Sequence, residues 1–326
     1  MYWLLICSIE VHRCLCLLHT SDIVAFHMPE SPKKYELRLD PEFNLDLGLG
    51  GAVQEMWNLD VNRLTPDVDY VLNVQKGKKP YWKEDSARDP LFTSVKSGVF
   101  KRPTYRTFMA LLDNYVSGTG TGESVTHTEQ KENYAFLRAI MATAPMQFCH
   151  QYLHKKIPDE VPEDQDDFVK VLYNIWFGLY NRERGGAKDS SGFEHVFVGE
   201  VKNGDVSGFH NWIQFYLEEK KGDLDYRGYI KPRDNSNSEH DSNDHVLSLQ
   251  FAWNGVEKFV GTSFIGVSPE FEMALYTTCF LLGEENNHIE LSTGTDVFGL
   301  NIRCYKMARD KIGTAFPEAT SHFEEE

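Results

Sequence analysis

The chain has 326 residues, of which 41% are hydrophobic and 13% aromatic, enough to form a core and to exclude an intrinsically disordered protein. Its 33 basic and 49 acidic residues give a net charge of −16, which argues against a protein that coats nucleic acid non-specifically but allows a small local phosphate site. The six cysteines are scattered without a CxxC pair, so neither a zinc module nor a dense disulfide framework is expected.

Residues 1–43 are expected to be a poorly ordered leader or extension. The first part of this stretch is apolar but is interrupted by Glu10, His12 and Arg13. Two interpretations stay open: a cleavable signal peptide, or a leader unrelated to a fold that starts near Met28. The compartment is therefore open, with cytoplasm or nucleus favoured and secretion expected if a signal peptide is present. No later segment has the roughly 20 apolar residues that span a membrane, so no membrane partner is expected.

Residues 44–185 are expected to be mainly helical. Apolar residues at helical spacing predict helices in 52–64, 105–116 and 132–156, the first with Val53, Met56, Trp57 and Val61 on one stripe. Residues 71–82 are compatible with a short hairpin. The acidic loop 157–168 places carboxylates at the start of another helix, where the macrodipole favours them. The glycine-rich linker 182–192 is the expected boundary with the second half.

Residues 186–326 show a different pattern. Alternation predicts a strand over 194–202, a tight turn at 203–205 and a helix that stops at Gly222. A hairpin is expected around Asn254 and Gly255, followed by a helix capped by Ser268 and a final pair of strands up to Pro317. Helices followed by hairpins and packed helices indicate an α+β fold.

Two histidines, His195 and His210, flank the predicted turn. On a strand, His195 would point away from Glu194 and Glu200, and His210 would lie in the first turn of the next helix. Two imidazoles with pKa values near 6.5 can serve as base and acid near neutral pH. The alternative is chance, because the chain has 12 histidines.

Two further patterns are weaker. His150 and His154 have the i,i+4 spacing of a metal-binding pair, but the glutamate of an HExxH motif is missing, so a helix surface is the expected explanation. Lys258 and Thr262 have the same strand parity, which would place an ammonium and a hydroxyl on one face. An isolated lysine after a turn is otherwise simply solvated.

Several of these stretches together resemble the EndoU family of uridylate-specific endoribonucleases, from about Gln54 to Pro317. The matching motifs are SGFEHVFVGE, GFHNWIQFYLEEKKGDLDYRGYI, LQFAWN, KFVGTSFIGVSPEFEMALYT and GTAFP, together with WNLDVNR, LLDNYV and LYNIWFGLY in the helical half. The resemblance implies an EndoU-like fold and a nuclease that cuts single-stranded RNA at uridylates, leaving 2′,3′-cyclic phosphate and 5′-OH ends. A non-catalytic RNA-binding module, or a secreted protein that acts through its surface, is the alternative on the same fold.

The resemblance also implies roles for individual residues. The catalytic trio falls on His195, His210 and Lys258, with His210 assigned as base and His195 as acid. Thr262 takes the position of a supporting hydroxyl. The family's late Thr-x-Tyr motif falls on Thr314 and Phe316, where Phe replaces the Tyr of many relatives, so a ring can stack on uracil but the phenol hydrogen bond is lost.

The remaining expectations concern ligands and partners. Arg182 is assigned, with Thr314 and Phe316, to substrate binding. The resemblance implies stimulation by manganese, and in some members by calcium. Glu194 and Glu200 are then either metal ligands or residues that orient a histidine or lysine. The expected partner is single-stranded, uridine-rich RNA and not DNA, bound by a monomer.

Overall fold

The computed structural model describes residues 43–80, 82–182, 186–231, 245–294 and 297–319. The leader predicted for residues 1–43 therefore lies almost entirely outside the described residues, as do parts of the linker and of the polar loop before Val246. Residues Asn44–Glu326 form one compact unit, distinct from Met1–Phe43. No helix within the described ranges is both long enough and apolar enough to cross a membrane.

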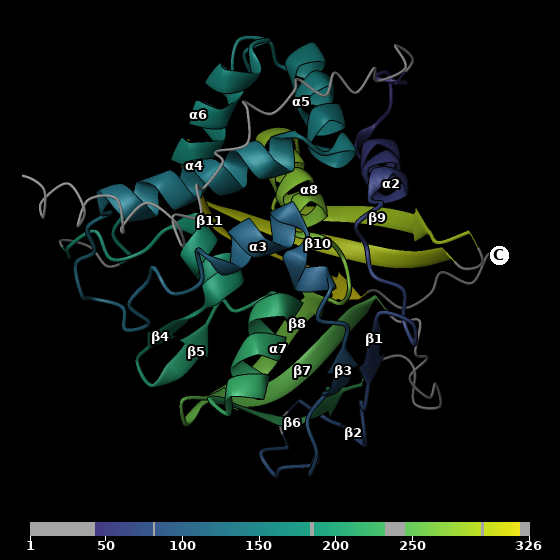
Figure 1. Cartoon of the computed structure of the whole chain (residues 1–326), viewed down its shortest axis with the longest axis vertical. Helices are drawn as coiled ribbons and strands as arrows, with labels where there is room; N and C mark the ends of the chain where they lie inside the picture. The colour runs from purple at the N-terminus through teal and green to yellow at the C-terminus, as the bar shows by residue number, and fades with distance from the viewer. Residues whose placement is uncertain (1–42, 81, 183–185, 232–244, 295–296, 320–326) are drawn as a thin grey trace, which may run out of the picture. The chain divides into compact units, whose positions relative to one another are not determined.

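The α+β class predicted from the sequence is confirmed. Helices are the main regular elements of the first half of the larger unit, and antiparallel strands dominate the rest (Figure 1). The helices of the first half are α2 (Leu49–Leu59), α3 (Pro103–Met109), α4 (His127–Met141), α5 (Ala144–Lys156) and α6 (Gln165–Phe177), with a short 3₁₀ turn at Val99–Lys101.

Local sequence signals explain where these helices begin and end. Thr126 and Glu129 form a reciprocal capping box at the start of α4. Asp164 caps α6, as the acidic loop predicts. The predicted run 132–156 is divided between α4 and α5, because Pro145 lacks an N–H and fits only the first turn of a new helix. Helix α2 stops at Leu59, so the prediction that Val61 joins its apolar stripe is wrong, and Val61 is 86% exposed.

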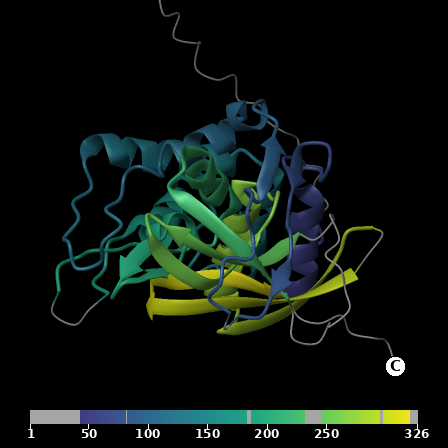
Figure 2. The ribbon, with the colours of Figure 1, turned by 90° about the horizontal axis from the view of Figure 1, so that it is seen from below.

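Two larger sheets contain most of the strands. One has the order β2-β6-β7-β8 and the other the order β11-β10-β9. Figure 2 shows the C-terminal strands, in yellow, beside the green strands of the first sheet. Their strands are β2 (Gly77–Lys78), β6 (Leu224–Ile230), β7 (Val246–Trp253), β8 (Val256–Phe264), β9 (Asn286–Ser292), β10 (Val297–Ala308) and β11 (Lys311–Ala319).

Two small antiparallel pairs complete the strands: β1 (Tyr70–Leu72) with β3 (Phe92–Val95), and β4 (Glu200–Lys202) with β5 (Asp205–Ser207). The hairpin predicted for residues 71–82 is wrong, because β1 pairs with β3 and β2 pairs in parallel with β6. The predicted turns at Asn203–Gly204 and Asn254–Gly255 are confirmed, each with two positive φ angles.

The remaining helices are α7 (Trp212–Lys221), which ends at Gly222 as predicted, and α8 (Pro269–Leu282). Ser268 caps α8 through the Phe271 amide, again as predicted. Almost all of α8 is buried, and it packs against α2, α5 and β10. It therefore joins the helical half to the strands that carry the site, so the described residues of this unit share one continuous core.

Candidate active site

His195 lies in a π-helical turn, Glu194–Val198, and the strand predicted over 194–202 is wrong in this part. The turn closes through a hydrogen bond of 2.8 Å from the Gly199 amide to the Glu194 carbonyl, five residues back. Gly199 has a φ of 98°, which ends the turn before β4 begins at Glu200. Every side chain of the turn is buried, so the alternation in the sequence reflects burial on all sides and not a pleated strand.

The chain then returns to this turn at Gly208. Gly208 has a φ of 66°, and a Cβ there would lie 1.8 Å from the His195 carbonyl oxygen. The Phe209 amide donates to the same carbonyl over 2.9 Å, and the His210 amide donates to the Val196 carbonyl over 2.7 Å. These contacts bring the two histidines together. His210 precedes α7 and is not in its first turn, because Asn211 is the N-cap.

The imidazole of His195 is held by a buried carboxylate. Its Nδ1 lies 2.7 Å from Oε2 of Glu200, and since a carboxylate only accepts, Nδ1 carries the proton. Nε of Arg182 lies 3.1 Å from the same oxygen. Burial raises the pKa of Glu200, but the hydrogen bond from His195 and the charge of Arg182 outweigh it and lower the pKa overall. Burial in turn lowers the pKa of His195 to about 4, against the raising effect of Glu200.

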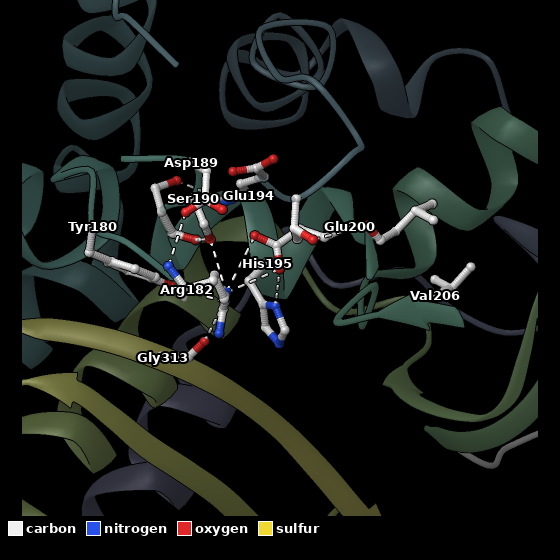
Figure 3. A network of polar contacts seen from close by, with 12 residues as sticks. Tyr180, Arg182, Asp189, Ser190, Glu194, His195, Glu200, Val206 and Gly313 are labelled. Carbon is white, nitrogen blue, oxygen red and sulfur yellow. Dashed lines mark hydrogen bonds and ion pairs between the residues drawn. The ribbon is translucent and has the colours of Figure 1, made fainter. Parts of the chain in front are cut away.

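Arg182 bonds to Glu200 and is itself held in place by several neighbouring groups (Figure 3). Its Nε also donates to Ser190 Oγ over 3.1 Å, and one terminal nitrogen donates to Tyr180 Oη over 3.0 Å and to the Gly313 carbonyl over 2.9 Å. The backbone of Arg182 donates to Asp189. Arg182 is thus a positioning residue in this structure, and its assignment to substrate binding stays a prediction.

His210 has a different partner. Its Nδ1 lies 2.9 Å from the backbone carbonyl of Thr262, which can only accept, so Nδ1 is again protonated. In the part of the chain that the structure describes, neither His195 nor His210 has a hydrogen-bond partner at Nε2. Burial lowers the pKa of His210 well below its usual value, and the nearby charges of Lys258 and His195 lower it further. Both imidazoles therefore present an unprotonated Nε2.

Lys258 is the third group of the predicted trio. Its side chain is buried against Gly261, and Nζ lies 3.4 Å from the Val206 carbonyl. Burial lowers the pKa of Lys258 to about 8. A register shift interrupts β8 between Lys258 and Gly261, so the parity argument that placed Lys258 and Thr262 on one face is wrong. The Thr262 hydroxyl instead pairs with Ser248, at 2.9 Å, while its carbonyl holds His210.

The two carboxylates assigned as tentative metal ligands differ sharply. Glu200 is engaged by His195 and Arg182, as the orienting alternative requires. Glu194 is fully buried, and neither of its carboxylate oxygens has a partner. Burial, together with the charges of Glu123 and Glu200, raises the pKa of Glu194 to about 10. Within the described residues, no group of three or more His, Cys, Asp or Glu side chains is arranged to hold a metal.

Strand β11 supplies the last predicted site residues. Phe316 is half-buried and stacks on His210, with ring centroids 4.5 Å apart and planes 15° apart. The hydroxyl of Thr314 is buried without a hydrogen-bond partner. An unpaired hydroxyl next to the stacked pair is a group that a ligand can satisfy, so it is consistent with the assigned binding role.

The His150–His154 pair is structural. Nε2 of His150 lies 2.7 Å from the Pro162 carbonyl, and Nδ1 of His154 lies 2.8 Å from the Val161 carbonyl. The His150 ring also stacks on Phe168. These contacts tie α5 to the acidic loop and explain the spacing without a metal.

Sequence reasoning missed the residues that position the trio. Asn211 caps α7 through the amides of Ile213 and Gln214, and its Nδ2 donates to buried Glu272 of α8 over 2.7 Å. An Asn directly before an apolar helical run is a known capping signal and was available in the sequence. Its partnership with Glu272 depends on tertiary structure, and no spacing rule predicts it.

The fold is α+β, and the candidate site holds two buried imidazoles and a buried ammonium, groups that can serve in acid–base chemistry. A model of the family Endoribonuclease XendoU matches residues 49–317, and the chain belongs to this family. It is 45% identical over 278 residues to Uridylate-specific endoribonuclease B of Danio rerio, covering 83% of this chain and 96% of that protein.

Two further relatives agree. The chain is 44% identical over 277 residues to Poly(U)-specific endoribonuclease of Xenopus tropicalis, covering 82% of this chain and 92% of that protein. It is also similar to the solved structure of XendoU, described as a splicing independent snoRNA processing endoribonuclease. That match has 43% identity and a TM-score of 0.72, and covers 84% of this chain and 97% of the solved one.

Proposed function

We propose that this endoribonuclease cuts single-stranded RNA at uridylates by transesterification, leaving 2′,3′-cyclic phosphate and 5′-OH ends. The uridylate-specific and poly(U)-specific names of its relatives support the substrate. The observation that carries the chemistry is the unequal bonding of the two imidazoles: a carboxylate holds His195 and a neutral carbonyl holds His210. DNA lacks the attacking 2′-OH and is not a substrate.

His210 is the base. With Nδ1 bonded to the Thr262 carbonyl, its neutral ring presents Nε2 as an acceptor, and no carboxylate among the described residues bonds the ring and favours the imidazolium. A depressed pKa keeps this nitrogen unprotonated over a wide pH range. His210 Nε2 therefore takes the proton of the 2′-OH as that oxygen attacks the adjacent phosphorus.

His195 is the acid. Glu200 stabilises its imidazolium, and the negative charge of a bound phosphate raises its pKa further, so His195 gains a proton when RNA occupies the site. Its Nε2–H then protonates the departing 5′-oxygen. Each proton transfer contributes roughly 10²–10⁴-fold to the rate.

Lys258 stabilises the charge that develops on the phosphorane. A buried ammonium acts in a low-dielectric site, where one such group contributes on the order of 10²–10³-fold. Thr314 is proposed to bind the uracil through its unpaired hydroxyl. Arg182 is proposed to keep Glu200 and β11 in position through its bonds to Glu200 and to the Gly313 carbonyl.

A divalent ion, manganese or calcium, is proposed to stimulate the reaction. Glu194 is the residue that fits it, because a buried carboxylate with both oxygens unpaired is costly unless a proton or a cation satisfies it. When bound, such an ion would supply positive charge near the site, and Glu194 would hold it as a carboxylate that has given up its proton. Glu200 does not fit a ligand role, since its oxygens are already bonded. The active species is proposed to be a monomer.

The test is to incubate the purified protein with a uridine-containing RNA oligomer, with and without manganese, and to identify the product ends. Cyclic phosphate and 5′-OH ends are expected, and 3′-OH with 5′-phosphate ends would contradict the mechanism. His195→Ala, His210→Ala and Lys258→Ala should each lose most activity with unchanged thermal unfolding. His154→Ala, outside the site, is the matched control and should stay active.

A further inference from the structure

One face of the strand pair β10–β11 carries polar side chains that have no role in the site described above. In antiparallel strands, residues that pair directly point to the same face of the sheet. Arg303 of β10 pairs with Phe316 of β11, and Asn301 pairs with Glu318. Phe316 stacks on His210, so this face is the one turned toward the candidate site. Arg303 therefore lies beside the ring that is predicted to stack on uracil.

Side-chain contacts confirm the direction in which Arg303 points. Its Nε lies 2.7 Å from Oε2 of Glu318, and Nδ2 of Asn301 donates to the same oxygen over 3.1 Å. A terminal nitrogen of Arg303 donates to Oδ1 of Asn286 on β9. Cys304, the next residue of β10, is buried on the other face of the sheet. The guanidinium thus lies on the face of Phe316 and is held there by Glu318 and Asn286.

Arg303 remains able to bind a ligand. A guanidinium has five N–H donors, and the partners of Arg303 among the described residues are Glu318, Asn286 and Tyr305. N–H groups are therefore left for a further acceptor. The side chain of Arg303 is 30% exposed and that of Glu318 is 38% exposed, so a ligand can reach the pair from solvent.

The cations already assigned to the site lie inside it. Lys258 is buried, and Arg182 is bonded to Glu200. The chain has a net charge of −16, so a strand of RNA that extends beyond the site needs a local positive charge to hold its phosphates. Arg303 supplies such a charge directly across from Phe316.

We propose that Arg303 binds a phosphate that flanks the scissile uridylate. The proposal rests on the proposed function and adds a phosphate subsite to it. Directly paired residues have Cβ atoms about 4.5–5.5 Å apart, so the long side chain of Arg303 reaches the backbone of a nucleotide whose base lies against Phe316. Its planar guanidinium can donate two parallel N–H groups to a phosphate. Glu318 orients the guanidinium, and its negative charge weakens the attraction for the phosphate.

Two substrates separate this subsite from the catalytic centre. The dinucleotide uridylyl-adenosine contains the scissile phosphate and no other. An RNA oligomer with adenylates on both sides of a single uridylate adds the flanking phosphates. Arg303→Gln should lower kcat/KM for the oligomer roughly fivefold and leave the dinucleotide unchanged, because only the oligomer has a phosphate to lose. Equal losses on both substrates, or no loss on the oligomer, would overturn the proposal.

Binding is measured by fluorescence anisotropy with a labelled oligomer that carries 2′-deoxyuridine at the uridylate and so lacks the attacking 2′-OH. Arg303→Gln should weaken its Kd roughly fivefold at low salt, and the difference should shrink as salt screens the contact. The dependence of log Kd on log salt should become shallower by about 0.7, the value for one phosphate contact to a single strand. An unchanged slope would overturn the phosphate contact.

Two matched variants test for a merely structural role. Glu318→Gln removes the negative charge beside the guanidinium but keeps a hydrogen-bond acceptor, so the Kd should tighten about twofold. A loss in Glu318→Gln as large as that in Arg303→Gln would overturn the proposal, because the pair would then be a structural brace. Arg309→Gln removes the same charge from the turn of the same hairpin, where Arg309 pairs with Glu160, and should leave the Kd unchanged. A loss as large as that in Arg303→Gln would reduce the effect to net charge.

The proposed function and this subsite can fail separately. If the wild-type protein cleaves neither substrate but binds the deoxyuridine oligomer, and Arg303→Gln weakens that binding, the proposed function is wrong and the subsite stands. If the wild type cleaves both substrates and Arg303→Gln matches it on both, the function stands and the subsite is wrong. A wild type that neither cleaves nor binds RNA would overturn both.

Discussion

The phenyl ring of Phe316 lies almost parallel to the imidazole of His210, with centroids 4.5 Å apart and an interplanar angle of 15°. One face of the ring predicted to stack on uracil is thus occupied by His210, the proposed base. Phe316 shields His210 from water on that side, and any uracil has to stack on its other face or edge. In the proposed mechanism, Phe316 therefore serves the base as well as the binding of uracil.

Replacement of Phe316 should affect both roles. Phe316→Ala is expected to lower kcat/KM about tenfold, because an aromatic pair contributes roughly 0.5–1.5 kcal/mol beyond its buried area. Solvent access should also raise the pKa of His210 and move the acidic limb of the pH–rate profile upward. Phe316→Tyr should keep the rate and sharpen selection of uridine over cytidine. Matched oligomers with one uridine or one cytidine measure both effects, and an unshifted acidic limb in Phe316→Ala would contradict the shielding role.

Glu200 should act through the charge it places on His195. Glu200→Gln keeps the shape but removes the charge that favours the imidazolium, so kcat should fall on the order of 10²-fold. The pKa of His195 should fall further, which shifts the profile of kcat toward lower pH. Glu290→Gln, an exposed residue outside the site, is the control. A uniform loss at every pH, with no shift of the profile, would indicate a merely structural carboxylate.

Glu272 should position His210 through Asn211. Its carboxyl oxygen accepts from Nδ2 of Asn211, and burial raises the pKa of Glu272 to about 8, so the group is largely neutral at pH 7. Glu272→Gln reproduces this neutral acceptor and should stay active. Glu272→Ala leaves Asn211 unpaired and should lower kcat about tenfold with little change in KM. A loss in Glu272→Gln as large as that in Glu272→Ala would refute the neutral-acceptor role.

The ammonium of Lys258 should add a decline of activity near pH 8 to the decline that follows from loss of the His195 proton. Burial lowers its pKa to about 8, so the charge is present below that pH and is lost as the pH rises through it. We expect kcat/KM to decline above about pH 8. The Lys258→Arg variant should be slower, but it should keep its positive charge above pH 8. It should therefore lack this decline, because a guanidinium does not titrate near that pH. The test compares the pH–rate profiles of the wild type and the variant. If both decline in the same way above pH 8, Lys258 is not the cause of that decline.

Glu194 should make stability depend on pH. Below pH 4.5, the ordinary pKa of a glutamate, the Glu194 carboxyl is protonated in both the folded and the unfolded state. Between that value and about 10, only the unfolded state ionises, so stability falls as the pH rises. Glu194→Gln should therefore raise Tm more at pH 8 than at pH 5. If a cation binds Glu194, manganese should raise Tm of the wild type at pH 8 but not of Glu194→Gln. An equal response in both proteins would place the cation elsewhere.

Sequence patterns predicted most of the helices, the two tight turns and the α+β class, because these depend on local chemistry such as caps, prolines and Asn–Gly pairs. The path around His195 was not predictable in the same way. The run Glu194–Val198 is buried on all sides, and a fully buried segment carries no periodic signal that separates a strand from a helix.

In the candidate site, too, some features could be predicted from the sequence and others could not. His195, His210 and Lys258 were found through motif order, and the structure brings them together. Their supports come from distant parts of the chain: the Thr262 carbonyl holds one histidine, and the Gly313 carbonyl holds the arginine behind the other. Backbone carbonyls leave no mark on a sequence, so these contacts could come only from the tertiary structure.

Strand β11 has a consequence for how the enzyme is made. It supplies the ring stacked on His210 and the carbonyl that anchors Arg182, yet it is the last strand in the described chain. During synthesis, both histidines and the lysine leave the ribosome before β11 does. The nascent chain thus carries the whole trio for a time without the ring that stacks on His210 and without the carbonyl that anchors Arg182. The proposed site is therefore complete only after the end of the described chain has been made and β11 has paired with β10.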